Sequence, residues 1–313
     1  MRIYRSLAEI VDLRGRPRAV AIGTFDGVHR GHQSIIAKAV QAAREMGGVA
    51  TVLTFEPHPA VVLRPETPPL LLTPLELKIR LLEQAAVDEV VAVPFDRDFA
   101  ALSPAAFCRL LLSERLGARQ VMVGQNFRFG HHGAGTPEDL LAFGQEHGFS
   151  VTAIGLLRDG EEPVSSTRIR ALIVEGAVEA AAGLLGRPHV LEGYVVAGAG
   201  RGRDLGTPTA NLAVSPLVAV PAEGVYVTRT VLPSGRVEAS VTSVGTNPTF
   251  ESDALLRVET YLLRFKGSLY GESIRVEFLQ RLRGQRAFPD ATTLVAQIER
   301  DVREAEAYFR AHP

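Results

Sequence analysis

The chain has little of several features that would direct it to particular classes of protein. Its 313 residues include one cysteine, Cys108, so an internal disulfide is excluded and a reducing compartment fits. Acidic and basic residues nearly cancel, at 35 against 34, so the net charge favours neither nucleic acid nor an anionic membrane as a partner. The N-terminus has no apolar signal core, and no apolar run approaches the ~18 residues of a membrane helix. We therefore expect a cytoplasmic protein without nucleic-acid or membrane partners.

Two common phosphate-binding motifs are also missing. A Walker A loop needs a Gly-Lys pair, and the chain contains none. The glycine-rich stretch Gly198–Leu212, GAGRGRDLGTPTANL, has Arg203 where a dinucleotide-binding fingerprint needs its last glycine, and no helix can follow before Pro208. Any nucleotide site in this chain must therefore be built in another way.

The first half of the chain alternates short apolar strands with amphipathic helices. The strands are expected at 19–22, 49–55, 89–94, 120–124 and 150–155, and the helices at about 30–46, 74–86, 103–115 and 136–147. Alternation with short links predicts an α/β, Rossmann-like domain with a parallel sheet and helices on both faces. Ligands of such sheets bind at the carboxyl ends of the strands, so polar clusters that close the strands are candidate site residues.

The second half changes to short, valine-rich alternating strands separated by glycine and proline, expected at about 190–197, 224–232, 236–244, 256–265 and 273–279. This pattern is typical of a small all-β barrel. A closing helix is expected at about 291–310, with Asp290 as its N-cap and an apolar stripe that packs on the barrel. A Gly-Arg-Pro sequence at 186–188 ends the helical pattern of the first half. We therefore place the two domains at 1–186 and 187–313.

The stretch Ala19–Val40, AVAIGTFDGVHRGHQSIIAKAV, is predicted to form a strand, a tight turn and a helix. A helix N-terminus carries unpaired N–H groups and the positive end of the dipole, which suits a polyphosphate. His29 and His32 are three residues apart and can face one phosphate chain, while Gly27 and Gly31 let an anion approach the backbone. Two histidines that are simply solvated are the alternative, and the combination in one segment favours phosphate binding.

Three further polar clusters close strands of the first half. In TFEPHP, residues 54–59, two prolines fix the direction of His58, although a rigid surface loop would look the same. In VGQNFRFG, residues 123–130, Asn126 offers donors and an acceptor, and the two phenylalanines either stack on a planar ring or fill the core. In PVSSTRIRALI, residues 163–173, the hydroxyls precede a helix either as N-caps or as a second anion site.

The glycine-rich loop of the second half ends in a Thr-x-Asn sequence. Oxygens of Thr209 and Asn211 suit Mg²⁺, and a glycine-rich loop with arginines can bind nucleotide phosphates, although an ordinary loop is the alternative. Further along, strand alternation puts Glu259 on one face together with Arg257. The glutamate then either faces a pocket opening, where it can accept a proton, or pairs in solvent with Arg257 or Arg275.

These segments resemble the prokaryotic bifunctional riboflavin kinase/FMN adenylyltransferase (FAD synthetase) family over roughly residues 15–310. GTFDGVHRGH resembles its nucleotidyltransferase signature, while LGTPTANL, GVY, GTNPTF and VETYLL resemble its riboflavin kinase segments. The resemblance implies that the second domain phosphorylates riboflavin to FMN and that the first transfers AMP to FMN, which releases pyrophosphate. It also implies ATP, riboflavin and FMN as partners, and Mg²⁺ used with ATP.

The resemblance implies roles for individual residues as well. For adenylyl transfer it implies His29 and His32 as catalytic residues, and as ATP- or FMN-binding residues Gly23, Phe25, Asp26, Gly31, His58, Asn126, Ser166, Thr167 and Arg168. For the kinase it implies Glu259 as catalytic base, Thr209 and Asn211 as metal ligands, and as ATP- or riboflavin-binding residues Gly198, Arg203, Gly206, Pro208 and Asn247. Pro163 stands where relatives commonly carry arginine, so Arg168 is expected to supply part of that charge.

Two other functions stay open on the residues alone. One is an adenylyltransferase for another small phosphoester, with a merely regulatory β domain. The other is a flavin-binding carrier without turnover, in which both histidines and Glu259 would be idle. The sequence also leaves a weak homo-oligomer open.

Overall fold

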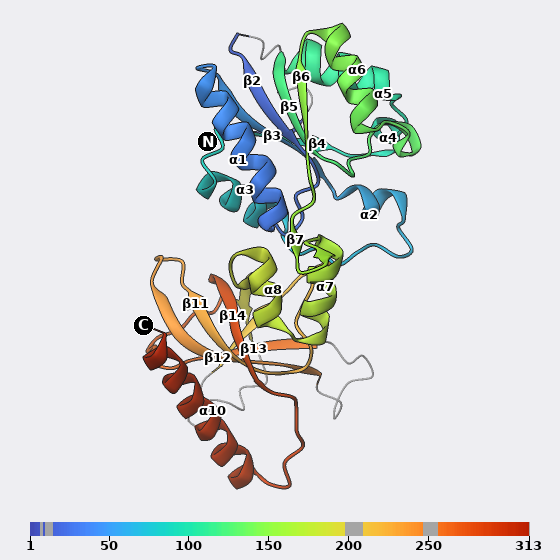
Figure 1. Cartoon of the computed structure of the whole chain (residues 1–313). Coiled ribbons are helices and arrows are strands. Elements are labelled where there is room, and N and C mark those ends of the chain that lie inside the picture. Colours follow the sequence, from blue (N-terminus) through green and yellow to red (C-terminus); the bar gives the residue numbers. More distant parts are fainter. Residues whose placement is uncertain (7–8, 10–14, 198–208, 247–255, 313) are drawn as a thin grey trace. The chain divides into compact units, whose positions relative to one another are not determined.

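The computed structural model describes the chain except for residues 7–8, 10–14, 198–208, 247–255 and 313. Contacts divide the chain into two compact units, Met1–Ser166 and Thr167–Pro313. Figure 1 shows the first in blue to green and the second in yellow-green to red. Each unit has its own sheet, so each is described by itself.

The first unit is built on a six-stranded parallel sheet with the order β1-β4-β3-β2-β5-β6. Its strands are Arg2–Tyr4 (β1), Arg18–Ile22 (β2), Val49–Glu56 (β3), Glu89–Pro94 (β4), Ala118–Gly124 (β5) and Ser150–Ile154 (β6). From β2 the chain winds outward through β3 to β4, and it then returns to β5 on the other side of β2. The direction of winding therefore changes between β2 and β5, and a ligand crevice is expected at the carboxyl ends of these two strands.

Helices cover both faces of this sheet, as the alternation predicts (Figure 1). On one face lie α1 (Arg30–Glu45) and α3 (Leu75–Gln84), and their apolar residues share a core with the alanines of β2. On the other face, α6 (Pro137–His147) packs beside a π-helix, η1 (Phe107–Arg115), which continues α5 (Pro104–Ala106). The predicted parallel α/β architecture is therefore confirmed.

Several short elements of this unit have too few residues for a readable periodicity. They are β1, α2 (Pro59–Leu63), α4 (Arg97–Ala100), the 3₁₀ turn η2 (His131–Gly133) and the hairpin of β7 (Arg158–Asp159) and β8 (Glu162–Pro163). The predicted helix at 103–115 exists, but most of it is π-helical. Cys108 is buried in it, and burial raises the pKa of the thiol to about 12, so the thiol stays protonated and unreactive.

The second unit contains a closed antiparallel barrel with the order β10-β13-β12-β11-β14-β9, which confirms the predicted all-β barrel. Its strands are His189–Val196 (β9), Ala210–Ala213 (β10), Gly224–Val231 (β11), Val237–Thr246 (β12), Leu256–Leu262 (β13) and Ser273–Arg283 (β14). Pairing of β10 with both β9 and β13 closes the ring, although β10 was not among the predicted strands.

The barrel interior holds a line of hydroxyl groups among apolar side chains. Its members are fully buried and bond to one another at 2.7–2.9 Å: Thr228, Thr230, Ser240, Thr242 and Thr260. These bonds link the five hydroxyls in one line, and the Ser240 hydroxyl donates to the Thr228 carbonyl at 3.0 Å, so each buried hydroxyl has a partner inside the barrel.

Two helices before the barrel belong to the second unit by their contacts. They are α7 (Ser166–Glu175) and α8 (Val178–Leu185). Arg281 of β14 donates to a Glu179 carboxylate oxygen at 3.1 Å and to the Glu175 carbonyl at 3.1 Å. The compact units therefore divide earlier than the change of composition at 186–188 suggests, and the functional boundary after residue 186 stays a prediction.

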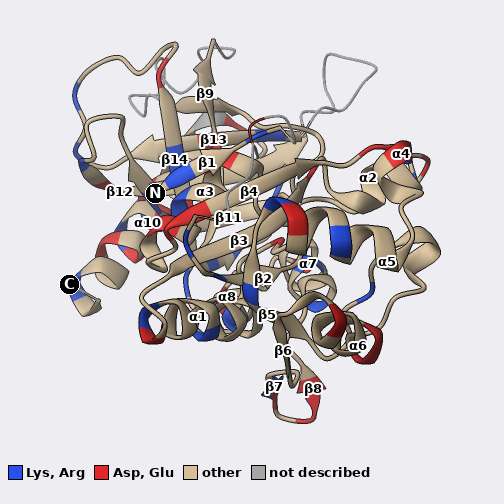
Figure 2. Cartoon of the chain, turned by 90° about the horizontal axis from the view of Figure 1, so that it is seen from above, with Lys and Arg blue, Asp and Glu red and all other residues tan. Residues whose placement is uncertain are grey.

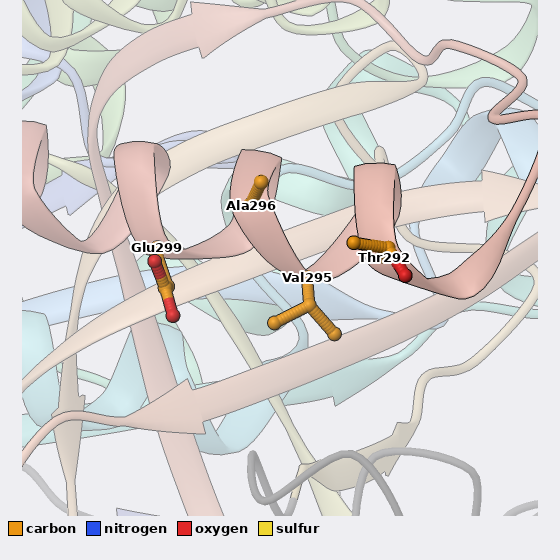
Figure 3. Close-up of a pocket in the computed structure, with 4 residues that line it drawn as sticks. All are labelled: Thr292, Val295, Ala296 and Glu299. Atoms are coloured by element: carbon orange, nitrogen blue, oxygen red, sulfur yellow. The ribbon is translucent and has the colours of Figure 1, made fainter.

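The closing helix α10 (Ala291–Ala311) packs on the barrel as expected. Asp290 caps it by accepting from Thr293 N at 2.8 Å, and a nearly buried ion pair joins Arg283 to Asp301 at 2.7 Å. Beside its first turns lies a hollow of about 400 Å³, lined by Thr292, Val295, Ala296 and Glu299 (Figure 3). No helix in the described part of the chain combines the length and the apolar content needed to span a membrane.

A buried ion pair holds the amino edge of the parallel sheet together. Arg18 at the start of β2 donates through Nε to Glu89 at the start of β4, at 2.9 Å, and both side chains are almost fully buried. A second guanidinium nitrogen reaches the other carboxylate oxygen at 3.3 Å. The pair therefore bridges the strand between them, β3, whose Thr51 hydroxyl donates to the same carboxylate.

We expect Arg18→Ala to lower the free energy of unfolding of the first unit by about 3–5 kcal/mol, because Glu89 would keep a buried charge without its partner. Arg109→Ala is the matched control, since Arg109 pairs with Glu114 at the surface, where a pair contributes about 0–1 kcal/mol. Urea unfolding followed by circular dichroism measures both losses. Equal losses in the two variants would show that the buried pair contributes no more to the free energy of unfolding than the surface pair.

Candidate active sites

The turn between β2 and α1 has an unusual backbone. Gly27 has a φ of +88°, and Phe25 and Val28 have φ of +49° and +40° although neither is glycine. Positive φ is a genuine outlier for a β-branched residue such as Val28 and costs on the order of 1–3 kcal/mol. Both side chains are buried, so packing holds the strained turn in one shape. Strain of this kind clusters at functional sites, which makes this turn the leading candidate in the first unit.

His29 and His32 form a stacked pair at the start of α1. Their ring centroids are 3.5 Å apart, and the planes differ by 19°. Nδ1 of His29 accepts from the backbone N–H of His32 at 3.3 Å and so caps the helix. A neutral His29 ring therefore carries its proton on Nε2, where it can donate. Gly31 makes room for this arrangement, since a Cβ there would come within 3.2 Å of the His29 ring.

Burial holds the imidazole of His32 in its neutral form at neutral pH in the free protein. Burial lowers the pKa of His32 well below its ordinary value, and the nearby His29 and Lys78 lower it further. Nδ1 of His32 is buried and has no hydrogen-bond partner in the described part of the chain. An incoming phosphate would therefore meet an N–H donor on the His32 ring rather than a full positive charge.

The buried side chain of Asp26 stabilises this turn through hydrogen bonds. It is buried, and its Oδ1 accepts from the backbone N–H of Leu72 at 2.9 Å and of Thr73 at 3.0 Å. The backbone N–H of Gly27 donates to the Thr73 hydroxyl at 2.8 Å. Phe25 is fully buried as well. The structure thus gives Asp26 and Phe25 a supporting position, and their predicted ATP- or FMN-binding roles stay predictions.

The predicted cluster that precedes α7 reaches the same turn. The Ser166 hydroxyl donates to the Asp26 carbonyl at 2.8 Å, although the two residues are far apart in the sequence. Gly23, which opens the turn, donates to the Leu53 carbonyl of β3 at 3.1 Å. Thr167 is exposed and Arg168 is half-buried in the first turn of α7. Ser166 is therefore brought to the histidine turn, while binding by Thr167 and Arg168 stays a prediction.

The remaining predicted residues of this unit also follow strands. His58 caps the short helix α2, and its Nδ1 accepts from Ala60 N at 3.1 Å. Asn126 is exposed just beyond β5, on the strand that flanks β2 at the change of winding. Phe129 is buried in the core and Phe127 stacks on it at 5.6 Å, so one phenylalanine fills the core as the sequence allowed. Asn126 therefore follows the strand next to β2, and its binding role stays a prediction.

Lys78 is a residue near this site that the sequence motifs do not single out. It lies on α3 with only 3% of its surface exposed, and its Nζ donates to the Thr54 hydroxyl at 3.5 Å. That hydroxyl donates in turn to the Thr24 carbonyl at 3.1 Å. Burial lowers the pKa of Lys78, while Asp26 and Glu56 act in the opposite direction. Helical spacing was an available signal, since Lys78 and the buried Leu82 share one face of α3.

In the second unit the strand register brings Asn211 and Glu259 together. Asn211 of β10 pairs directly with Glu259 of β13, and opposite residues have Cβ atoms about 4.5–5.5 Å apart. Both are half-buried, while Val258 and Thr260 point into the barrel. Thr209 immediately precedes β10 and is also half-buried. The Thr-x-Asn sequence and the glutamate thus occupy one place on the outer face of the barrel.

The alternative for Glu259, an ion pair in solvent, does not occur in the described part of the chain. There the carboxylate pairs with neither Arg257 nor Arg275, and Ser243 of β12 is its other direct neighbour. The predicted ATP- or riboflavin-binding residues of this unit lie outside the described residues: Gly198, Arg203, Gly206, Pro208 and Asn247. Their roles stay predictions.

The oxygens near Glu259 fit a magnesium ion that arrives with its nucleotide. A hydroxyl, an amide and a carboxylate are the hard oxygen donors that Mg²⁺ prefers, and Mg²⁺ usually takes one or two protein ligands plus substrate phosphates. The described residues contain no cluster of three or more His, Cys, Asp or Glu that could hold a metal by itself. The hollow beside α10 has one carboxylate and no cation, so it offers nothing for a phosphate. Basic and acidic residues are interspersed over the ribbon in Figure 2.

The neutral state of His32 predicts how the stability of the first unit depends on pH. Its folded-state pKa lies below the unfolded value of about 6.5, so below that pH the unfolded chain binds a proton that the folded chain does not. Stability is therefore full above pH 6.5 and declines as the pH falls towards 5. We expect His32→Gln to flatten this decline in urea unfolding midpoints. His131→Gln, an exposed control, should leave the slope unchanged, and equal slopes for all three proteins would contradict the assignment.

Comparisons with known proteins match a different family model to each of the two parts of the chain. A family model for FAD synthetase matches residues 13–168, and one for riboflavin kinase matches residues 185–309. A bifunctional riboflavin kinase/FMN adenylyltransferase from Listeria monocytogenes is 37% identical over 93% of this chain and 92% of its own length. The protein of that name from Escherichia coli strain K12 is 33% identical over 99% and 98%.

A solved structure shares the fold over the whole length. It comes from Streptococcus pneumoniae, is described as a macrolide-efflux protein, and matches with a TM-score of 0.88 at 30% identity. The match covers 98% of this chain and 99% of that one. On the family models and the near full-length relatives, the chain belongs to the bifunctional riboflavin kinase/FMN adenylyltransferase family, with its FAD synthetase region first and its riboflavin kinase region second.

Proposed function

We propose that the first region adenylylates FMN at the turn between β2 and α1, and that the second phosphorylates riboflavin beside Asn211 and Glu259. One observation carries the proposal furthest. The stacked pair of His29 and His32 lies at the start of α1, after the turn that follows β2, where the winding of the sheet changes. ATP, riboflavin and FMN are the substrates proposed, and the boundary after residue 186 separates the two activities.

In the first reaction site, a phosphate oxygen of FMN attacks the α-phosphorus of ATP in line. The new P–O bond joins FMN to AMP, and the bond to pyrophosphate breaks. The attacking oxygen is already ionised, so no protein nucleophile or strong base is needed. The rings of His29 and His32 donate N–H groups to the charge that develops on the α-phosphate, and the N-terminus of α1 adds its dipole. Asn126 and Ser166 hold substrate beside them.

In the second site, the 5′-hydroxyl of riboflavin attacks the γ-phosphorus of ATP and ADP leaves. Glu259 accepts the hydroxyl proton, because an unionised alcohol is a poor nucleophile. Thr209 and Asn211 would hold Mg²⁺, which when bound neutralises charge on the phosphates. The direct pairing of Asn211 with Glu259 supports this assignment, since it puts base and metal ligand side by side.

A cytoplasmic location is the last part of the proposal. Cys108, the single cysteine, is buried and its raised pKa keeps it protonated, which agrees with a reducing compartment. Neither proposed reaction needs a redox partner.

We expect His32→Ala to lower FAD formation from FMN and ATP by roughly 100-fold, the usual scale for the loss of one transition-state donor. Formation of FMN from riboflavin by the same protein should be unchanged, because the two sites belong to different units. Flavin chromatography of the reaction mixture measures both products. His131→Ala, on the exposed turn η2, is the control. A His32 variant with wild-type FAD formation would remove the histidine pair from the mechanism.

We expect Glu259→Gln to lower formation of FMN from riboflavin by about 10²–10⁴-fold, since glutamine keeps the shape of the side chain but accepts no proton. Supplied FMN should restore FAD formation to the wild-type rate, which tests the independence of the two sites. Glu299→Gln on α10 is the exposed control. Riboflavin phosphorylation at the wild-type rate in the Glu259 variant would exclude the glutamate as the base.

A further inference from the structure

The ammonium of Lys78 is buried and has few polar partners in the described part of the chain. The group can donate three hydrogen bonds, yet it makes one, of 3.5 Å, to the neutral hydroxyl of Thr54. The described part of the chain contains no ion pair to Lys78, although its side chain is 3% exposed. An unpaired buried charge is unfavourable, so stability does not explain the residue.

The same unit shows how a buried cation is satisfied when stability is its purpose. Arg18 has a carboxylate, Glu89, at 2.9 and 3.3 Å, together with a backbone carbonyl at 3.1 Å. Lys78 has no such partner. The two carboxylates that act on its charge are engaged or distant: Asp26 accepts from residues 72 and 73, and Glu56 forms no hydrogen bond or ion pair with it.

Lys78 also lies at the functional edge of the sheet. Its partner Thr54 is near the carboxyl end of β3, and Thr54 donates to Thr24 in the turn that leads to the histidines. Its charge acts on His32 as well as on Asp26 and Glu56. These are the charged or titratable groups that face it from α1, from the turn after β2 and from β3. The Lys78 ammonium therefore lies on the buried side of the turn that is proposed to bind a polyphosphate.

Composition sets this lysine apart. Only three of the 34 lysines and arginines in the chain are lysines, and the other two, Lys38 and Lys266, are exposed. The chain thus uses an ammonium, and no guanidinium, at this buried position. A lysine is a compact point charge, whereas arginine needs a planar partner for its fork of donors.

We propose that Lys78 is a positioning residue for adenylyl transfer, whose buried charge draws a polyphosphate onto the turn between β2 and α1 and whose hydrogen bond to Thr54 directs the ammonium towards that turn. His32 is neutral and offers a donor without charge. Lys78 adds positive charge from the buried side of the turn, through an interior where charges are weakly screened. The inference rests on the proposed adenylyl transfer in the first region.

The test compares Lys78→Met with Lys78→Arg and with the exposed control Lys38→Met, all in the full chain. We expect Lys78→Met to raise KM for ATP in FAD formation at least tenfold and to weaken calorimetric binding of inorganic pyrophosphate by a similar factor. Lys78→Arg keeps the charge and should recover part of both losses. FMN formation from riboflavin should be unchanged, and the urea midpoint should stay equal or rise, because methionine removes an unpaired buried charge at similar volume.

Two results would overturn the inference. One is wild-type KM and pyrophosphate affinity in Lys78→Met. The other is a Lys78→Met protein that unfolds more easily or does not fold, since Lys78 would then be structural. Thr54→Val separates the two parts of the proposal, because it removes the hydrogen bond and keeps the charge, and it should affect KM less than Lys78→Met does. Absence of FAD formation by the wild-type protein would instead refute the proposed function.

Discussion

The parallel direction of β2, β3 and β5 is the constraint on which the first site depends. Parallel strands carry all their carboxyl ends to one edge, so the segments that follow them converge even though they are distant in sequence. The histidine turn, the segment before α2 and Asn126 all follow such strands. Asp26 then joins this edge to residues 72–73 and, through its carbonyl, to Ser166. One buried carboxylate thus fixes the turn whose outer side is left for substrate.

At that edge of the sheet, hydrogen-bond donors and positive charge come from different side chains. Burial keeps His32 neutral, and His29 stacks on it at 3.5 Å, an arrangement that suits donors that must lie close to each other. A pair of charged imidazoles at 3.5 Å would repel and lose the geometry. Positive charge is held separately by Lys78, in a part of the unit that water does not reach. Directional donors at the surface of the turn and a point charge beneath it can together bind an anion that neither would hold alone.

The sequence predicts those features that depend on local pattern. Buried strands such as Val49–Glu56 read as apolar runs, because both faces of a parallel sheet are covered. Strands of three or four residues, β1 and β10, are too short for a period to be visible. The assignment of α7 and α8 to the second unit depends on tertiary contacts, such as those of Arg281, which composition does not reveal. Local chemistry thus gave both architectures, while tertiary contacts decided where the compact units divide.

For the site residues too, local pattern could be predicted from the sequence and tertiary contacts could not. The histidine pair was predicted because glycines, histidines and strand lie in one segment, Glu259 because alternation puts it on one face with Arg257, and Asn211 because the Thr-x-Asn oxygens suit Mg²⁺. Their direct pairing was not, since it depends on the register of β10, an unpredicted strand. Lys78 was missed because a single lysine on a helix resembles an ordinary surface charge until its burial is known. Asp26 was expected to face the ligand, and only the structure shows its bonds to residues 72 and 73.

The two sites differ in chemistry because one nucleophile is already ionised and the other carries a proton. FMN attacks with a phosphate oxygen that is already ionised, so adenylyl transfer needs donors and charge and no base. Riboflavin attacks with an alcohol that must lose its proton, so its phosphorylation needs a base, and in the second unit the carboxylate residue Glu259 lies beside Asn211. A carboxylate at the mouth of the first site would repel both substrates, and the carboxylate found there, Asp26, is turned inward and hydrogen-bonded. The chemistry of the attacking oxygen thus accounts for why one region places its acid inside and the other places it at the surface.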